Sequence, residues 1–153
     1  MTDGNRTSVI GIIGGSGVYD IQGLTNKRWV HVQSPFGKPS DELLFGELNG
    51  QQMVFLPRHG RGHRIPPTDI NFRANIDSLK RAGVTDVISV SAVGSLREHL
   101  RPGMFVIVDQ FIDRTFARAK SFFGTGLVAH VSMAHPVCGR LDDHIEAAAR
   151  EAG

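Results

Sequence analysis

Short apolar runs alternate with polar, glycine-rich segments along this chain, and most of these runs have the length of a strand. Several are rich in β-branched, aromatic or leucine side chains, and the first two kinds favour extended structure. Strands are predicted for residues 9–13, 28–32, 43–48, 52–56, 84–90 and 104–108. Asn49 and Gly50 lie between the third and fourth runs, and Asn-Gly in that position is typical of a tight hairpin turn.

One stretch between the strands has helical spacing instead. Phe72, Ile76 and Leu79 are separated by four and three residues, so they fall on one face of a helix. The helix follows two prolines, and Thr68 is predicted as its N-cap because a hydroxyl there accepts a hydrogen bond from the first turn. Gly83 is predicted to end it, since glycine readily adopts the left-handed conformation found after helices.

These elements together indicate an α/β fold. A second helix is predicted for residues 140–152, and the long segment 115–137 is expected to be irregular. Strands separated by a helix favour a sheet with parallel pairs, while the hairpin adds an antiparallel pair. We therefore expect a mixed, twisted central sheet flanked by helices. Residues 1–8 are predicted to be a disordered tail, and residues 9–153 to be part of a single domain without repeats or linkers.

The composition is that of a globular protein with little net charge. Hydrophobic residues make up 41%, charged residues 21%, and the formal net charge is +2, which gives no reason to expect a nucleic-acid or membrane partner. Cys138 is the single cysteine, which excludes a disulfide within these 153 residues and fits a reducing, cytoplasmic setting. No apolar run is long enough to span a membrane, and the polar N-terminus lacks a signal-peptide core.

Small and basic residues follow three of the predicted strands. The first strand runs into the glycine-rich segment 14–17, which contains Ser16; the fourth runs into Arg58 and His59; the fifth runs into Ser91. Glycines let a ligand approach backbone N–H groups, and an arginine fork can give an oxyanion two parallel hydrogen bonds. A phosphate site is therefore predicted where these strands end. The same residues are also compatible with a plain tight turn and a solvated basic loop.

Six segments, in consistent order, resemble the methylthioadenosine phosphorylase branch of the trimeric purine nucleoside phosphorylase family. They are residues 10–17, 34–41, 58–61, 71–76, 94–97 and 109–115. The resemblance runs from about Val9 to the end of the chain. It is far more specific than the glycine-rich segment alone, whose spacing matches neither the dinucleotide-binding motif nor the P-loop.

The resemblance implies an enzyme, a glycosyltransferase of the pentosyltransferase type. Such an enzyme cleaves 5′-methylthioadenosine with phosphate, yielding adenine and 5-methylthioribose 1-phosphate in purine and methionine salvage. The family uses no metal and no organic cofactor, because inorganic phosphate is a co-substrate. Its members are expected to be cytoplasmic homotrimers that bind a purine nucleoside and phosphate.

The resemblance also assigns roles to individual residues. His130 is expected to reach the 5′-group pocket of a neighbouring subunit. The positions expected to bind phosphate and substrate are Ser16, Arg58, His59, Ser91 and Ala92.

This chain is shorter than the family's chains, which limits what can be carried over. The acid that serves the purine base is expected beyond the position of Gly153, so the chain resembles the N-terminal half and no catalytic residue is predicted within it. The residue that separates adenine from 6-oxopurines lies in the same missing part. A methylthioinosine or 6-oxopurine nucleoside phosphorylase is therefore one alternative, and a non-catalytic phosphate-binding fragment is another.

Overall fold

The computed structural model describes residues 8–15 and 17–153. The chain divides into two compact units, one ending at Ala92 and one comprising Val93–Gly153.

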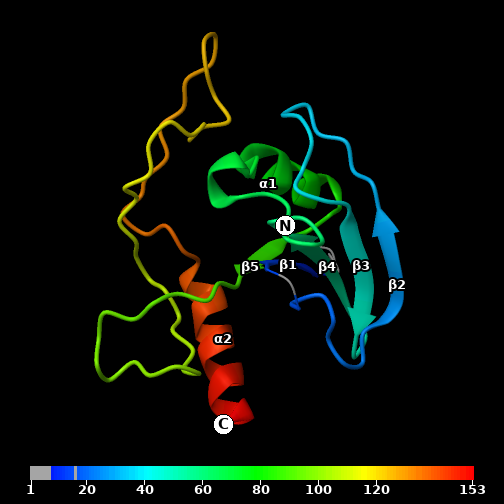
Figure 1. Ribbon diagram of the computed structural model, residues 1–153, viewed down its shortest axis with the longest axis vertical. Helices are drawn as coiled ribbons and strands as arrows, with labels where there is room; N and C mark the ends of the chain where they lie inside the picture. Colours follow the sequence, from blue (N-terminus) through cyan, green and yellow to red (C-terminus); the bar gives the residue numbers. More distant parts are fainter. Residues whose placement is uncertain (1–7, 16) are drawn as a thin grey trace, which may run out of the picture. The chain divides into compact units, whose positions relative to one another are not determined.

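The first unit is built on a five-stranded mixed sheet (Figure 1). In chain order its strands are β1 (Val9–Gly14), β2 (Thr25–Val30), β3 (Leu43–Leu48), β4 (Gln51–Pro57) and β5 (Asp86–Ser89). Their order across the sheet is β2-β3-β4-β1-β5. The central strand β1 pairs in parallel with β4 and β5, whereas β3 pairs antiparallel with β2 and β4. The predicted mixed α/β sheet is thus confirmed.

The hairpin between β3 and β4 is confirmed at the predicted residues. Asn49 and Gly50 both have positive φ, at 49° and 81°, and Leu48 pairs with Gln51 directly across the turn. Two successive left-handed residues give a turn whose twist matches that of the flanking strands.

The helix α1 (Phe72–Arg81) is confirmed, but its predicted N-cap is wrong. Thr68 lies in the 3-10 helix η1 (Pro67–Asp69), and Asn71 caps α1 instead by accepting a hydrogen bond from the Ala74 backbone N–H at 3.1 Å. Because the 3-10 helix occupies residues 67–69, α1 begins only at Phe72. Asn71, which directly precedes Phe72, is therefore in the N-cap position. Gly83 adopts a φ of +85° after the helix, as predicted.

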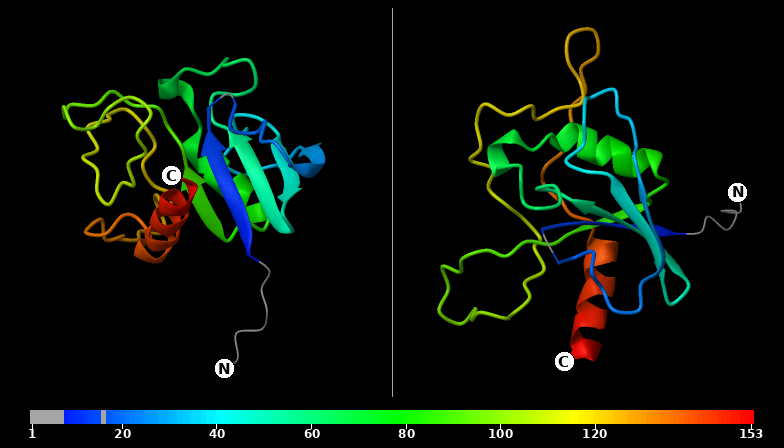
Figure 2. Two further views of the ribbon diagram at one scale, coloured as in Figure 1. Left: turned by 90° about the horizontal axis from the view of Figure 1, so that it is seen from below. Right: turned by 45° about the vertical axis from the view of Figure 1, so that its right-hand side comes forward.

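Both faces of the sheet carry apolar clusters, because successive side chains of β4 alternate between them. One cluster contains Ile12, Leu24, Leu44, Met53 and Phe55. The other contains Leu43, Val54, Leu56, Val84 and Leu79, so α1 covers that face (Figure 2). The buried side of α1 is formed by Ala74, Asn75, Ser78 and Leu79, whereas Phe72 and Ile76 are more than 40% exposed.

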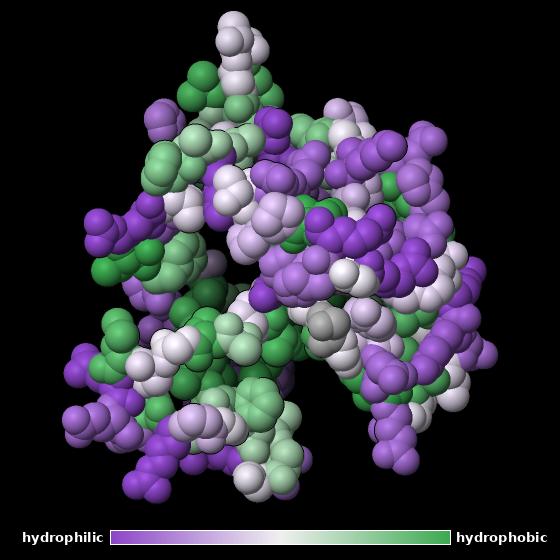
Figure 3. All heavy atoms as spheres, viewed as in Figure 1, coloured by the Kyte–Doolittle hydropathy of each residue, from purple (hydrophilic) through white to green (hydrophobic). Residues whose placement is uncertain are grey.

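The second unit contains one helix, α2 (Gly139–Ala152), as predicted, preceded by irregular chain. The strand predicted for residues 104–108 is wrong. These residues form no strand, and the side chain of Phe105 is 87% exposed. A strand requires a neighbour to take its backbone hydrogen bonds, and none of the described residues pairs with this run. Its apolar side chains therefore remain largely exposed. Figure 3 shows hydrophobic atoms (green) on the viewed face of the molecule.

No helix in the described part of the chain combines the length and apolar character needed to cross a membrane.

Candidate functional site

Three parallel strands end at the same edge of the first unit's sheet. Gly14 at the end of β1 pairs with Pro57 at the end of β4, and Ile13 pairs with Ser89 at the end of β5. The pairing continues one residue further, because the Arg58 N–H donates to the Gly14 carbonyl at 3.0 Å. In open α/β sheets this carboxyl edge is where ligands bind. The structure thus places the segments after these three strands beside one another.

Arg58 connects two of these segments through its side chain. Its Nη1 donates to the Ser91 hydroxyl at 2.6 Å and to the Val90 carbonyl at 2.9 Å. The guanidinium is therefore held across the ends of β4 and β5, and its Nη2 is not used in either bond. The sequence-predicted residues Arg58 and Ser91 are brought together, which is the geometry that a shared anion requires.

His59 is buried, with an exposed fraction of 8%, and both of its ring nitrogens have partners. Its Nδ1 lies 2.8 Å from the Ile65 carbonyl, which can only accept, so Nδ1 carries the proton. Its Nε2 then accepts a hydrogen bond from Arg58 Nε at 3.1 Å. His59, which the sequence predicts to bind phosphate, thus contacts Arg58 directly, and its role toward the anion stays a prediction.

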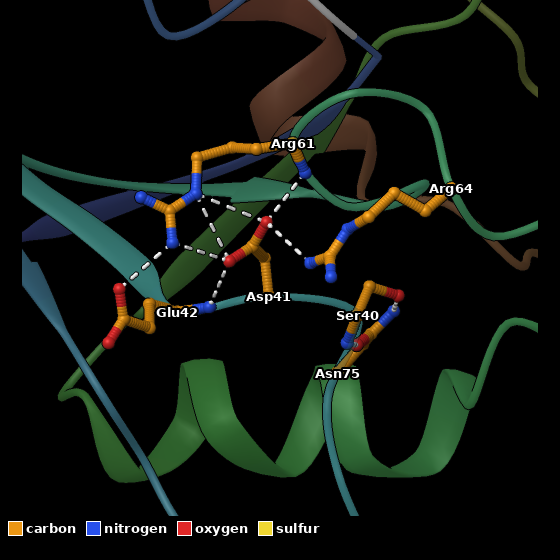
Figure 4. Close-up of polar contacts among 6 residues, drawn as sticks. All are labelled: Ser40, Asp41, Glu42, Arg61, Arg64 and Asn75. Carbon is orange, nitrogen blue, oxygen red and sulfur yellow. Dashed lines mark hydrogen bonds and ion pairs between the residues drawn. The ribbon is translucent and has the colours of Figure 1, made fainter.

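The loop from Arg58 to Ile65 is held from a second direction by Asp41 (Figure 4). The Asp41 carboxylate accepts the Arg61 backbone N–H at 2.6 Å, forms an ion pair with Arg61 Nη2 at 2.9 Å, and lies 3.5 Å from Arg64 Nη2. Burial alone would raise the pKa of Asp41, but hydrogen bonds from the Arg61 side chain and backbone and from the Glu42 backbone outweigh it and lower that pKa. The same carboxylate raises the pKa of Arg61.

Asp41 is itself fixed through its neighbour Ser40 (Figure 4). The side-chain amide of Asn75, on the buried face of α1, accepts the Ser40 backbone N–H at 2.8 Å and donates to the Ser40 hydroxyl at 2.9 Å. Asn75 is only 3% exposed. A continuous set of hydrogen bonds therefore runs from α1 through residues 40 and 41 to the loop that carries Arg58.

The remaining predicted residues are placed as follows. Ser16 lies outside the described residues. Ala92 is exposed at the end of the first unit, and His130 is exposed in the irregular part of the second unit. Among the described residues, no group of three or more histidine, cysteine, aspartate or glutamate side chains is arranged to hold a metal ion.

Sequence reasoning assigned no role to Asp41, Arg61 or Asn75. All three do occur inside the segments that carry the family resemblance, and an amide at a buried position of a helix is a signal that could have been used. Asp41 also lines a cavity of about 360 Å³ together with Lys38, Arg64 and other residues, whereas Arg58, His59, Ser91 and Ala92 do not line it.

Comparison with known proteins connects this geometry to a family. The family model of the phosphorylase superfamily matches residues 9–153. This chain belongs to the phosphorylase superfamily.

Within the superfamily, the chain is similar to proteins named S-methyl-5′-thioadenosine phosphorylase. The protein of that name from Rhodospirillum rubrum is 67% identical over 146 residues, which are 95% of this chain and 50% of the relative. The resemblance predicted from the six sequence segments is thereby confirmed. The chain spans about half the length of the curated relatives it matches.

Solved structures of the superfamily agree. The crystal structure of a methylthioadenosine phosphorylase from an Antarctic soil metagenomic library superimposes with a TM-score of 0.85 at 54% identity, covering 90% of this chain and 48% of that one. The Schistosoma mansoni methylthioadenosine phosphorylase in complex with adenine gives a TM-score of 0.85 at 42% identity, covering 95% of this chain and 55% of that one. The nucleoside phosphorylase-like fold predicted from the sequence is confirmed.

Proposed function

We propose that this chain supplies the phosphate-binding part of an enzyme that cleaves 5′-methylthioadenosine with inorganic phosphate. The products are adenine and 5-methylthioribose 1-phosphate. The observation that carries the proposal is the position of Arg58, whose guanidinium spans the ends of two parallel strands beside the glycine-rich end of a third. The names of the relatives, at up to 67% identity, supply the substrate class.

The chemistry explains why these residue types are needed. A phosphate oxygen forms a bond to C1′ of the sugar while the bond from C1′ to the purine nitrogen breaks, and that electron pair leaves with the base. The sugar carries positive charge during the change, so a phosphate held against it is both nucleophile and counter-charge. Fixing the two reactants in this arrangement can contribute roughly 7–11 kcal/mol in favourable cases.

In this proposal Arg58 and the backbone N–H groups of the glycine-rich segment bind phosphate before the reaction, so little reorganisation is needed. His59 fixes the orientation of Arg58 by accepting from its Nε. Ser91, Ala92 and Ser16 complete the phosphate and sugar side. The proton or hydrogen bond that the leaving base requires is assigned to a residue outside these 153.

We further propose a cytoplasmic homotrimer in which His130 of one subunit contacts the 5′ group of the nucleoside bound to its neighbour. The exposure of His130 and the family resemblance support this assignment.

The test uses the protein purified from the cells that produce it, and its mass is measured first. The assay then measures the release of adenine. Adenine should appear from 5′-methylthioadenosine only when phosphate is present, with one sugar 1-phosphate formed per adenine. A protein that binds phosphate but releases no adenine would contradict the proposed reaction. Preferential release of hypoxanthine from 6-oxopurine nucleosides would contradict the proposed substrate class.

A further inference from the structure

The loop that carries Arg58 contains three arginines, and the structure treats them differently. Arg61 and Arg64 both direct their guanidinium groups to the Asp41 carboxylate (Figure 4). Arg58 directs its guanidinium to Ser91 and Val90 at the carboxyl edge of the sheet. The buried Asp41 carboxylate thus pairs with Arg61 and Arg64, whereas the Arg58 guanidinium lies at the ends of the strands.

The backbone of this loop needs external support to keep its shape. Gly60, Gly62 and His63 all lie in the left-handed region, with φ values of +70°, +78° and +54°. That conformation is disfavoured for a residue with a side chain, so His63 stores local strain. The loop also approaches its support closely, because a Cβ atom added to Gly60 would lie 3.1 Å from the Ser40 carbonyl oxygen.

Two hydrogen bonds close the loop onto His59. The Ile65 N–H donates to the His59 carbonyl at 3.0 Å, and the His59 ring donates back to the Ile65 carbonyl. Residues 59–65 are therefore closed into a ring of contacts, whose far side is held by Asp41 through the Arg61 N–H. If Arg61 were displaced, the His59 ring would shift with the loop, and the hydrogen bond from Arg58 Nε to His59 would be altered.

We propose that Asp41 is a positioning residue for phosphate binding: it holds the loop 58–65 so that Arg58, and not Arg61 or Arg64, faces the anion. Asp41 does not touch the substrate in this account. It acts through the Arg61 backbone and side chain, and Asn75 fixes it in turn through Ser40. The inference rests on the proposed function, since it assigns a purpose to the phosphate site described above.

The test is the substitution Asp41→Asn, which keeps the size of the side chain but removes its charge and replaces one acceptor oxygen by a donor. Two quantities are measured on the protein as its cells produce it. The first is the dissociation constant for inorganic phosphate by direct titration, and the second is the pair of KM values for phosphate and for 5′-methylthioadenosine. Misplacing a binding group can cost between about tenfold and a hundredfold, so the phosphate constants should rise at least about tenfold. The KM for the nucleoside should change by less than about twofold, since no nucleoside contact is removed.

Asp77→Asn is the matched control. It also removes a carboxylate that pairs with an arginine, Arg81 at 2.7 Å, and its further hydrogen-bond partner is the Ser34 side chain, which lies outside the loop 58–65. Phosphate affinity should be unchanged in this variant. An equal loss in Asp77→Asn and Asp41→Asn would overturn the proposal, because the effect would then be general.

Arg61→Ala decides the question if Asp41→Asn does not fold. It removes the guanidinium that pairs with Asp41 and Glu42 but leaves the Arg61 backbone N–H bonded to Asp41, so phosphate affinity should fall by less than in Asp41→Asn and by more than in the control. Unchanged phosphate affinity in a folded Asp41→Asn, or in Arg61→Ala where Asp41→Asn does not fold, overturns the inference and leaves the proposed function standing. An unsubstituted protein that fails to bind phosphate overturns the proposed function itself.

Discussion

At the scale of single residues, identity alone does not separate the three arginines between positions 58 and 64. Their partners do, since Arg58 bonds to Ser91 at the sheet edge while Arg61 and Arg64 bond to Asp41. A guanidinium used for an ion pair is less available for a ligand, whereas Arg58 keeps Nη2 outside its bonds to Ser91 and Val90. We accordingly propose the phosphate role for Arg58.

Arg58→Ala should weaken phosphate binding by about tenfold to a hundredfold, because an anion loses its charged, forked hydrogen-bond donor. Thermal stability should fall as well, because the buried His59 Nε2 loses its hydrogen-bond donor, so phosphate affinity is compared on folded protein. Phosphate titration by calorimetry measures the effect, and Arg81→Ala on α1 serves as the control. Phosphate saturation that is the same in Arg58→Ala and in the unsubstituted protein would remove Arg58 from the site.

His130→Ala tests the assignment that comes from the family resemblance. The KM for 5′-methylthioadenosine should change relative to that for a nucleoside with a 5′ hydroxyl, because the residue is proposed to contact only the 5′ group. Kinetics with the two nucleosides at saturating phosphate provide the measurement. If both KM values stay as they were, His130 does not contribute to the 5′ pocket.

At the scale of elements, α1 supports the site through polar residues on its buried face. Asn75→Ala removes both hydrogen bonds to Ser40 and leaves a buried backbone N–H without an acceptor, so the free energy of unfolding should fall by about 1–3 kcal/mol. Ser78→Ala is the matched control on the same face. The Ser78 hydroxyl is buried and has no hydrogen-bond partner among the described residues, so its removal should cost little. Urea unfolding compares the two, and an equal loss of stability in both variants would contradict the role given to Asn75.

Asp41 should also make stability depend on pH. Its pKa is lowered in the folded protein, so its ionised form stabilises the fold above the unfolded pKa, and this contribution is lost as the pH falls below about 4. The stability difference between the unsubstituted protein and Asp41→Asn should therefore shrink as the pH falls from 5 to about 3. Thermal unfolding over that range is the measurement. A difference that is constant across the range would mean that Asp41 keeps an ordinary pKa.

The elements predicted correctly from the sequence are of two kinds. Some are determined by their own residues, and the others pair with strands of the first unit. The Asn49-Gly50 turn determines its own backbone conformation, and β1, β4 and β5 find partners in one another. Residues 104–108 were assigned wrongly because an apolar run becomes a strand only beside another strand. The N-cap was assigned to Thr68 instead of Asn71 because the position of the preceding 3-10 helix depends on how the chain packs.

At the scale of the whole molecule, the candidate site depends on residues that are distant in sequence and adjacent at one sheet edge. The pattern of small and basic residues after three strands was enough to predict Arg58 and Ser91 as neighbours. Asp41 could not be found in this way, because its carboxylate matters only through its burial and its contacts with a loop 20 residues further on. The chain covers about half the length of the curated relatives it matches.

The most direct test of the central claim is a crystal structure of the protein grown in inorganic phosphate. We predict one tetrahedral ion within hydrogen-bond distance of the Arg58 guanidinium, the Ser91 segment and the glycine-rich segment after β1. Electron density for phosphate at another place, with this edge of the sheet empty, would contradict the account.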